Sequence, residues 1–443
     1  MNQYLKTFVV SIGMMTDAYE IFLMNICYAI IKEIYGETTY SSVLSCTVLI
    51  GMACGQLIFG FLADAVGKKI MFITTLTILI LFSILQLFSF EVSKGSGPYV
   101  VLACFRFILG LGIGGEYPLS SSIASEDAQP HNRGRKLVFI FSMQGIGNIL
   151  APLIVWILLL TPLKLDLVWR IALALGAVPC ILTLYHRIVM DMPKKKKKHV
   201  TSKKVLKALI KRNWFYLLGT AGCWFIFDIA FYGNSMFNTT ILQVIGFGPS
   251  ETDTDPRQGL ISTTIGNLIL VLIAFPGFVV SFFLVDKIGR KPLQLFGFAG
   301  TAICFFLMAL FKDIILEYVA FLFIILYGLS FFFQNMGPNT TTYINAAETY
   351  DPRIRGTFNG LSAASGKTGA MVGTAVFNPF TQFFGEKITF CTCGVLMIVG
   401  LFLTFIVPES KGVDIEEVND DLDGYEDLKD SSETSSETSS NTH

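Results

Sequence analysis

Long apolar stretches follow one another along almost the whole chain, separated by shorter polar or glycine-containing segments. Each stretch is long enough to cross the hydrocarbon core of a bilayer as a helix, which takes about 20 residues. The sequence lacks the ten-residue alternation that marks the strands of a membrane β-barrel. We therefore expect an all-α polytopic membrane protein with twelve transmembrane helices, near residues 7–31, 41–64, 70–90, 98–122, 135–160, 168–189, 214–243, 260–285, 292–311, 316–344, 356–382 and 388–407.

One long polar break interrupts this series. It contains the basic run Lys194–Lys198 and lies between the sixth and seventh apolar stretches, so it divides the chain into two halves of six. After the last stretch the chain becomes acidic and then rich in Ser and Thr, a composition that cannot bury enough apolar surface to fold. The expected organisation is an N-terminal six-helix bundle (1–190), a basic cytoplasmic linker (191–213), a C-terminal six-helix bundle (214–410) and a disordered cytoplasmic tail (411–443).

The two halves repeat each other. Two unrelated motifs recur with the same offset of 222 residues, which argues against a chance match. The matches are Asp64-x2-Gly67-Lys68-Lys69 with Asp286-x2-Gly289-Arg290-Lys291, and Glu126-x3-Pro130-x2-Arg133-Gly134 with Glu348-x3-Pro352-x2-Arg355-Gly356. Transporters built from two parallel repeats bind their substrate between the repeats, near the middle of the bilayer. The repeat therefore predicts two related bundles with a substrate site between them.

Composition and charge agree with this interpretation. Hydrophobic residues make up 53% of the chain and charged residues only 15%, which is too apolar for a soluble globular protein. Lys and Arg number twenty-one in the loops on one side, with Arg187 counted among them, and seven on the other. Basic loops stay in the cytoplasm, so both termini are expected there, and the expected location is the plasma membrane. The first apolar stretch is expected to remain as a helix rather than to be cleaved as a signal peptide.

The cysteine and histidine residues do not indicate an enzyme. The nine cysteines lie mostly inside apolar stretches without the spacing of metal ligands, and the four histidines lie at helix ends, in loops or at the terminus. We therefore expect no cofactor, no metal and no catalytic residue. The basic run between the halves indicates topology and contact with anionic lipid rather than nucleic-acid binding. The partners expected are the lipid bilayer and a small solute, with the protein acting as a monomer.

One carboxylate stands out within the apolar stretches. Asp228 lies in the middle of the seventh stretch, and Trp224 and Tyr232 flank it at a spacing of four, so the three share one face of a helix. An ionisable side chain at bilayer depth costs several kcal/mol and usually faces a cavity or a partner. Lys367 in the second half is a candidate partner. The alternative is a structural salt bridge without substrate contact.

Further motifs resemble a known family. The loops Asp-x2-Gly-basic-basic in both halves, together with Arg106-Phe-x2-Gly110-x-Gly112-x-Gly114, resemble the major facilitator superfamily over residues 7–410. The run Gly114-Gly-Glu116-Tyr117-Pro118-Leu-Ser120 is similar to the Gly-Gly-Asp-Tyr-Pro-Leu-Ser signature of the phosphate:proton symporter family. Glu116 replaces the aspartate of that signature, which keeps the charge and moves it about one methylene outward.

The resemblance implies roles for three sets of residues. Those expected to bind substrate are Tyr117, Gln144, Trp224, Asp228, Tyr232 and Lys367, with Asn335 and Asn339 bordering the pocket. Those expected to handle protons are Asp17, Glu116 and Asp228, with Glu20 one turn from Asp17. Those expected to form a breakable cytoplasmic gate are Asp64, Arg133, Asp286, Arg290, Glu348 and Arg355.

The chemistry of these residue types fits inorganic phosphate, which carries one to two negative charges near neutral pH. Lys367 can offset that charge, and Asp228 can accept hydrogen bonds from the OH groups of a protonated phosphate. Fully ionised sulfate lacks those donors. The predicted function is therefore import of inorganic phosphate by proton symport through alternating access.

Three alternatives remain open at this point. The first is a major facilitator transporter of a sugar or of another organic or inorganic anion, because Glu348-x6-Arg355-Gly356 and Pro408-Glu409-Ser-Lys-Gly412 also occur in sugar porters. Coupling to sodium instead of protons is the second alternative. A transporter-like sensor is the third, and a long folded cytoplasmic extension would favour it.

Overall fold

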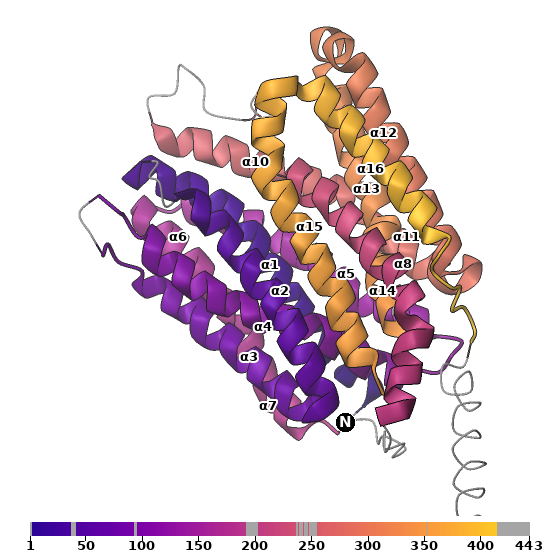
Figure 1. The fold of residues 1–443 in the computed structure, drawn as a ribbon. Coiled ribbons are helices and arrows are strands. Elements are labelled where there is room, and N and C mark those ends of the chain that lie inside the picture. The colour runs from indigo at the N-terminus through magenta and orange to yellow at the C-terminus, as the bar shows by residue number, and fades with distance from the viewer. Residues whose placement is uncertain are drawn as a thin grey trace, which may run out of the picture.

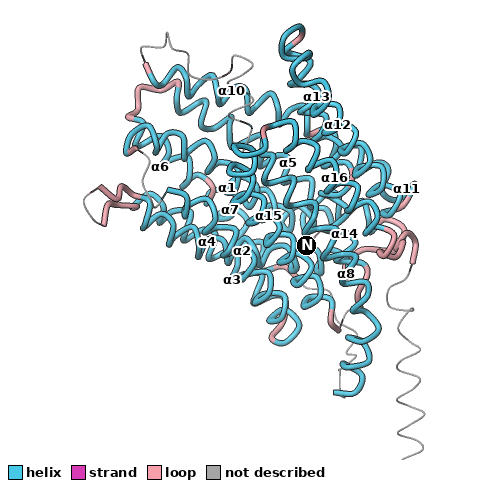
Figure 2. The backbone as a smooth tube through the Cα atoms, turned by 45° about the horizontal axis from the view of Figure 1, so that its top comes forward, coloured by secondary structure: helices cyan, strands magenta, loops and turns pink. Residues whose placement is uncertain are grey.

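The computed structural model describes residues 2–36, 41–92, 95–191, 203–235, 255–351 and 353–413, together with Asn238, Leu242 and Phe247. Within these residues the regular structure is entirely helical, as Figures 1 and 2 show. The prediction of an all-α fold is thus confirmed. The predicted linker residues 192–202, which include Lys194–Lys198, and the tail from residue 414 onward lie outside the described residues.

The first half contains seven α-helices and one short 3-10 helix in the described residues. They are α1 (Gln3–Tyr35), α2 (Ser41–Ala65), α3 (Lys68–Leu85), η1 (Gln86–Phe88), α4 (Tyr99–Glu126), α5 (Arg133–Leu159), α6 (Leu165–Leu175) and α7 (Ala177–Val189). The last two form one transmembrane segment that is interrupted at Gly176. The six predicted spans of this half therefore correspond to six segments.

The second half repeats this arrangement. Its helices are α8 (Lys203–Ser235), α10 (Pro256–Ala274), α11 (Pro276–Ile288), α12 (Arg290–Tyr318), α13 (Ala320–Met336), α14 (Pro338–Glu348), α15 (Arg355–Phe384) and α16 (Glu386–Thr404). Proline interrupts two spans, because Pro276 and Pro338 lack the N–H that would continue the preceding helix. Helix α8 begins earlier than predicted, so residues 203–213 of the expected linker are helical.

Eleven of the segments are long and apolar enough to cross a membrane. The twelfth, α15, has 30 residues but is more polar, since it carries Lys367 and many Gly, Ser, Thr and Asn residues. It packs against α8 of its own half and α2 of the other, so its polar side chains need not face lipid. This placement explains how a polar helix can belong to the transmembrane layer.

The two bundles meet along α2 and α15 and along α5, α10 and α11. Glycines permit the closest approach. A Cβ atom at Gly60 of α2 would lie 2.6 Å from the carbonyl oxygen of Gly356, and one at Gly360 would lie 2.4 Å from that of Gln56. Larger side chains at these positions would push the bundles apart.

Candidate functional site

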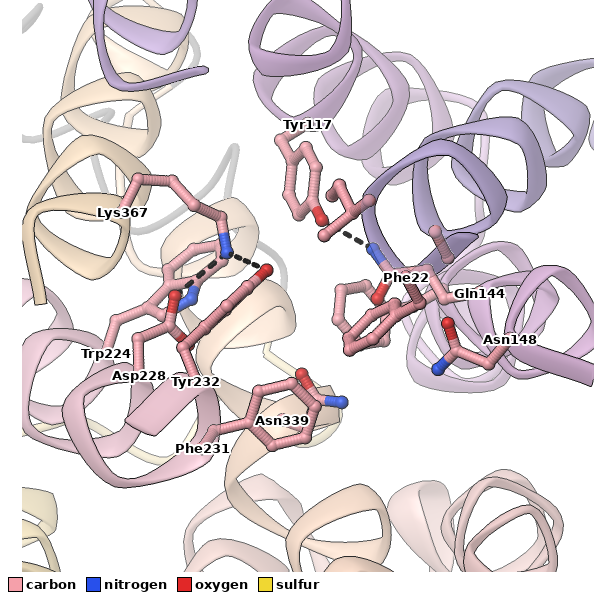
Figure 3. A pocket seen from close by; sticks show the side chains of 13 residues that line it. Phe22, Tyr117, Gln144, Asn148, Trp224, Asp228, Phe231, Tyr232, Asn339 and Lys367 are labelled. Atoms are coloured by element: carbon pink, nitrogen blue, oxygen red, sulfur yellow. Dashed lines mark hydrogen bonds and ion pairs between the residues drawn. The ribbon is translucent and has the colours of Figure 1, made fainter. Parts of the chain in front are cut away.

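A small cavity lies between the two bundles (Figure 3). The first bundle contributes residues of α1, α4 and α5, and the second contributes residues of α8, α14 and α15. The lining residues are Ala18, Ile21, Phe22, Tyr117, Phe141, Gln144, Asn148, Trp224, Asp228, Phe231, Tyr232, Asn339 and Lys367. The cavity thus brings together seven of the eight residues expected to bind substrate.

Lys367 and Asp228 form a buried ion pair on the side of the second bundle. The Nζ atom of Lys367 donates to Asp228 Oδ2 at 2.9 Å and to the Tyr232 hydroxyl at 2.9 Å. Asp228 is 2% exposed and Lys367 3% exposed, so neither charge is screened by bulk water. The four-residue spacing places Asp228 and Tyr232 on one face of α8, which lets one ammonium group contact both.

Neutral polar groups lie opposite this pair. Gln144 on α5 donates its Nε2 hydrogen to the Tyr117 hydroxyl at 2.7 Å. The rings of Tyr117 and Trp224 approach to 6.3 Å across the bundle interface. A Cβ atom at Gly366 would lie 2.4 Å from Trp224 Cδ1, so the glycine beside Lys367 makes room for the indole ring. The cavity therefore offers one cation, one carboxylate and several neutral donors.

The two asparagines differ in position. Asn339, on α14, lines the cavity, whereas Asn335, on α13, lines a neighbouring cavity. Asn335 donates to the carbonyl oxygen of Ala274 at 3.2 Å and accepts from Asn339 at 2.8 Å. The prediction that both border one pocket therefore fails for Asn335. The break at Gly337 puts the two residues on different helices, so their hydrogen-bonded side chains line different cavities.

Sequence reasoning missed several lining residues, among them Asn148 and Phe22. Asn148 follows Gln144 by one helical turn on α5 and lines both cavities, and that spacing was a usable signal. Phe22 on α1 stacks on Tyr232 with ring centroids 6.3 Å apart and meets Phe231 edge to face at 6.1 Å. These aromatic contacts join α1 to α8, and no sequence spacing within one helix could reveal them.

Three of the four carboxylates expected to handle protons, Asp17, Glu20 and Glu116, lie deep in the first bundle, whereas Asp228 lies on α8 of the second. Glu116 is held by Arg187, whose Nη1 and Nη2 atoms donate to its two carboxylate oxygens at 2.7 and 2.8 Å. Arg187 was counted above among the loop charges, which is wrong, because it is fully buried in the last turn of α7. Asp17 is also fully buried, and neither of its oxygens has a hydrogen-bond partner among the described residues.

Glu20 has a different environment from Asp17, although the two are one turn apart. Ser83 donates to Glu20 Oε1 at 2.7 Å and Gln86 donates to Oε2 at 3.3 Å. Arg106 lies 3.8 Å from Oε2 and donates to the backbone carbonyl of Glu20 at 3.0 Å. Glu20 is therefore the anchor of a network that joins α1, α3 and α4.

The gate residues lie at the bundle interface, near the first turns of α5 and α15. Asp64 at the end of α2 accepts from the backbone N–H and the hydroxyl of Thr357 at 2.8 and 2.9 Å. In the repeat, Asp286 accepts from the backbone N–H of Arg135 at 2.9 Å. Each carboxylate thus caps the first turn of a helix in the opposite bundle, α15 or α5, where the helix dipole favours a negative charge.

A second pair of contacts reinforces this end. Glu348 accepts from Arg133 of the other bundle at 2.9 Å and from Arg290 at 2.8 and 3.0 Å. The repeat-related contact is looser, because Arg355 lies 3.8 Å from Glu126 and donates instead to the carbonyl oxygen of Tyr350 and the hydroxyl of Ser125. All six predicted gate residues therefore lie in contacts near the Asp-x2-Gly loops, in two related clusters.

Comparison with known proteins places this architecture. The family model described as "Major Facilitator Superfamily" matches residues 10–374. The chain belongs to the major facilitator superfamily. A putative inorganic phosphate transporter 1-13 of Oryza sativa subsp. japonica is 32% identical, covering 97% of this chain and 93% of the relative. Inorganic phosphate transporter 1-1 of Arabidopsis thaliana is 31% identical, covering 95% of each.

Solved structures agree with the fold of this major facilitator protein. The proton:xylose symporter XylE bound to 6-bromo-6-deoxy-D-glucose has a TM-score of 0.76 at 16% identity, covering 93% of this chain and 97% of that one. The low identity restricts this likeness to the fold. The named relatives are transporters and not enzymes, in agreement with the sequence interpretation. The family and the two-bundle architecture predicted from the motifs are therefore confirmed.

Proposed function

We propose that this major facilitator protein imports inorganic phosphate together with protons by alternating access. The observation that carries the proposal is the buried Lys367–Asp228 pair on a cavity between the bundles. A buried ion pair of this kind adds little to folding stability, because the cost of desolvating the two charges offsets much of their attraction. Such a pair suits a site where a ligand replaces one of the two partners. The names of the relatives, inorganic phosphate transporters, support phosphate as that ligand.

The geometry gives each side chain a role toward a protonated phosphate. The ammonium of Lys367 offsets the negative charge, and Asp228 accepts hydrogen bonds from the phosphate OH groups. Gln144, Tyr117 and Trp224 supply further donors from both bundles, so the ligand would draw the two halves together. Tyr232 and Asn339 complete the set, and Asn148 is an additional amide on the same face as Gln144.

Proton coupling is assigned to the buried carboxylates. Asp17 and Glu116 lie in the first bundle beside the cavity, and Glu20 supports them through its network with Arg106. Protonation of Asp17, of Glu116 or of both would load the transporter from outside. When phosphate binds, Asp228 would be released from Lys367. As the site empties, Asp228 would return to Lys367, which completes the cycle.

Alternating access would use the clusters at the ends of α2 and α11. In this conformation Asp64 and Asp286 cap helices of the opposite bundle, so the gate on this side is closed. Transport requires these hydrogen bonds to break while the opposite side closes. We place this gate and both termini on the cytoplasmic side, with the basic linker and tail, and the protein in the plasma membrane as a monomer with the domain boundaries given above.

The deciding experiment is uptake of radiolabelled phosphate into proteoliposomes containing the purified protein. A proton gradient and a sodium gradient are imposed separately, and excess sulfate or glucose is added as a competitor. We expect uptake that follows the proton gradient and resists both competitors. Stimulation by sodium alone would replace the coupling ion, and competition by glucose would favour a sugar as substrate.

A further inference from the structure

Three charged side chains form a buried trio beside the central cavity. They are Asp17 on α1, Glu116 on α4 and Arg187 on α7, and none of them has any exposed surface. Arg187 and Glu116 make two parallel hydrogen bonds of 2.7 and 2.8 Å. Such a two-pronged contact fixes both the distance and the plane of the two groups. Asp17 takes no part in it.

Further contacts hold the Arg187–Glu116 pair in place. Arg187 also donates to the carbonyl oxygen of Phe72 at 3.0 Å, and its guanidinium lies 3.7 Å from the centre of the Phe72 ring. The Thr75 hydroxyl donates to Glu116 as well. A Cβ atom at Gly13 would lie 1.9 Å from Glu116, so α1 passes directly over the pair. Both oxygens of Glu116 accept hydrogen bonds, which is the behaviour of an ionised carboxylate.

Asp17 has the opposite environment. Neither oxygen has a hydrogen-bond partner among the described residues. The titratable groups that face it are Glu20 on its own helix, Glu116 and Tyr117 on α4, Arg187 and Cys180 on α7, and Tyr232 and Tyr343 of the other bundle. An ionised carboxylate without a partner in such a place pays the full desolvation penalty, so the neutral acid is its stable form here.

We propose that Arg187 is the positioning residue of proton coupling. It holds Glu116 as a permanent carboxylate, and Asp17 is thereby the one member of the trio that takes up and releases the proton. The proton binds a carboxylate oxygen of Asp17 from outside and leaves from the same oxygen to cytoplasmic water, with no other bond formed or broken. This rests on the proposed proton-coupled transport and narrows it, because the family resemblance assigns proton handling to Glu116 as well.

The charges predict an unusual pattern of variants. In Glu116→Gln, Arg187 loses its partner and pairs with Asp17, which then stays ionised. In Arg187→Gln, Glu116 loses its counter-charge and competes for the proton. Each single variant should lose at least about tenfold in proton-driven phosphate accumulation, because Asp17 can no longer take up the proton in the first and shares it with a second buried carboxylate in the second. The double variant Glu116→Gln/Arg187→Gln removes both charges, so Asp17 titrates alone again and accumulation should return.

The test measures labelled phosphate in proteoliposomes in two ways. Accumulation under an imposed pH gradient reports coupling, and exchange at equal pH and equal phosphate reports binding and movement without a net proton flux. The matched control is Asp313→Asn/Lys387→Gln, a charge-neutral change at an exposed pair. We expect the double variant to accumulate phosphate with the pH dependence of the wild type.

Two other results separate the hypotheses. A double variant that exchanges phosphate but does not accumulate it would show that Glu116 carries the proton, and the role of Arg187 would be overturned. A wild-type protein that exchanges no phosphate would instead contradict the proposed substrate.

A second measurement needs neither the double variant nor the substrate. Infrared difference spectra across a pH step in the purified protein detect the carbonyl stretch of a protonated buried carboxylic acid. The band should disappear in Asp17→Asn and remain in Arg187→Lys, which keeps the positive charge. A band that persists in Asp17→Asn places the proton on another carboxyl and overturns the proposal.

Discussion

Single residues decide whether the central cavity can exchange one anion for another. Lys367 has two partners, the Asp228 carboxylate and the Tyr232 hydroxyl, each at 2.9 Å. In the proposed mechanism, phosphate replaces the carboxylate without leaving the cation uncompensated, and the carboxylate returns when phosphate leaves. A substrate site of this type works because its empty and occupied states have similar charge balance.

Asp228→Asn tests this exchange. The substitution preserves shape, so the protein should still fold and reach the membrane. Lys367 then has no carboxylate to rejoin when the site empties, which costs about 2–5 kcal/mol for a buried charge pair. Labelled-phosphate uptake should therefore fall to background, whereas Tyr232→Phe, which removes one neutral acceptor, should retain measurable uptake. Size-exclusion chromatography in detergent measures the amount of folded protein. Loss of folded protein in Asp228→Asn would indicate a purely structural carboxylate.

Sequence reasoning at this scale was most reliable along one helix. The spacing of four placed Trp224, Asp228 and Tyr232 together, and the structure brings all three to the cavity. It was least reliable where the chain breaks or where a partner comes from elsewhere. Asn335 and Asn339 lie on different helices because of the break at Gly337, although their side chains are hydrogen-bonded, and Arg187 looked like a loop charge because it lies in the last turn of a helix. A buried partner of that kind becomes visible only once the helices are packed.

At the scale of elements, the interruptions are as informative as the helices. Hydropathy predicted the transmembrane segments as unbroken runs, yet three of them consist of two helices joined at Gly176, at Pro276 or at Gly337-Pro338. The two prolines could have been recognised as breaks from sequence, since each removes a backbone hydrogen bond. Gly176 carried no such signal. A Cβ atom there would lie 2.2 Å from Glu20 Oε1, so the close approach of α1 leaves no room for a side chain at this position.

Gly356, in the first turn of α15 at the gate, provides a second prediction. A Cβ atom at Gly356 would lie 2.6 Å from Asp64 Oδ1 and 2.7 Å from the backbone oxygen of Gly60, so Gly356→Ala should force α2 and α15 apart. The closed gate would lose stability and phosphate uptake should fall several-fold. Thr368→Ala on the same helix is the control, because that hydroxyl donates to the carbonyl oxygen of Ala364 within its own helix. Unchanged uptake in Gly356→Ala would show that the capping contact does not control the cycle.

The start of α5 and the end of α4 provide a pH prediction. Burial raises the pKa of Asp127, but hydrogen bonds from Lys136 and Lys6, each 2.6 Å long, outweigh it and lower the pKa below its usual value. Because the folded pKa is the lower one, the stabilisation is present above the unfolded value of about 3.9 and is lost as the pH falls through the folded pKa. Solvent screening keeps it at about 1 kcal/mol or less.

Thermal unfolding in detergent checks this prediction. Asp127→Asn should melt at a lower temperature than the wild type at neutral pH, and the difference should vanish as the medium is acidified below about pH 3. A difference that grows on acidification would reverse the sign of the shift.

At the scale of the whole molecule, the repeat accounts for the architecture and also for its asymmetry. The 222-residue offset in the sequence identifies the two bundles and pairs Asp64 with Asp286 and Arg133 with Arg355. It could not reveal that the two clusters differ in tightness, because identical motifs pack against different neighbours. Arg133 reaches Glu348 at 2.9 Å, whereas Arg355 stays 3.8 Å from Glu126.

This asymmetry predicts that the two glutamates contribute unequally to the closed gate. Glu348 is 2% exposed and holds Arg133 of the other bundle as well as Arg290, so Glu348→Gln leaves the buried Arg133 without a carboxylate, while Arg290 keeps Asp286 at 3.0 Å. Glu126 pairs mainly with Lys68 of its own bundle, so Glu126→Gln removes only a weak link between bundles. Glu348→Gln should therefore shift the population toward the open gate by several-fold, and Glu126→Gln should shift it much less.

The opening of the gate can be followed as the distance between the ends of α2 and α11. Spin labels at Ala65→Cys and Lys287→Cys, exposed positions related by the repeat, report this distance by pulsed electron resonance once the accessible native cysteines are replaced. The long-distance population should grow in Glu348→Gln and stay near the wild-type value in Glu126→Gln. Equal growth in both variants would mean that the bundles are held by the symmetric caps at Asp64 and Asp286. The salt-bridge clusters would then only position the loops, and the geometry of Arg133 would not control the direction in which the site opens.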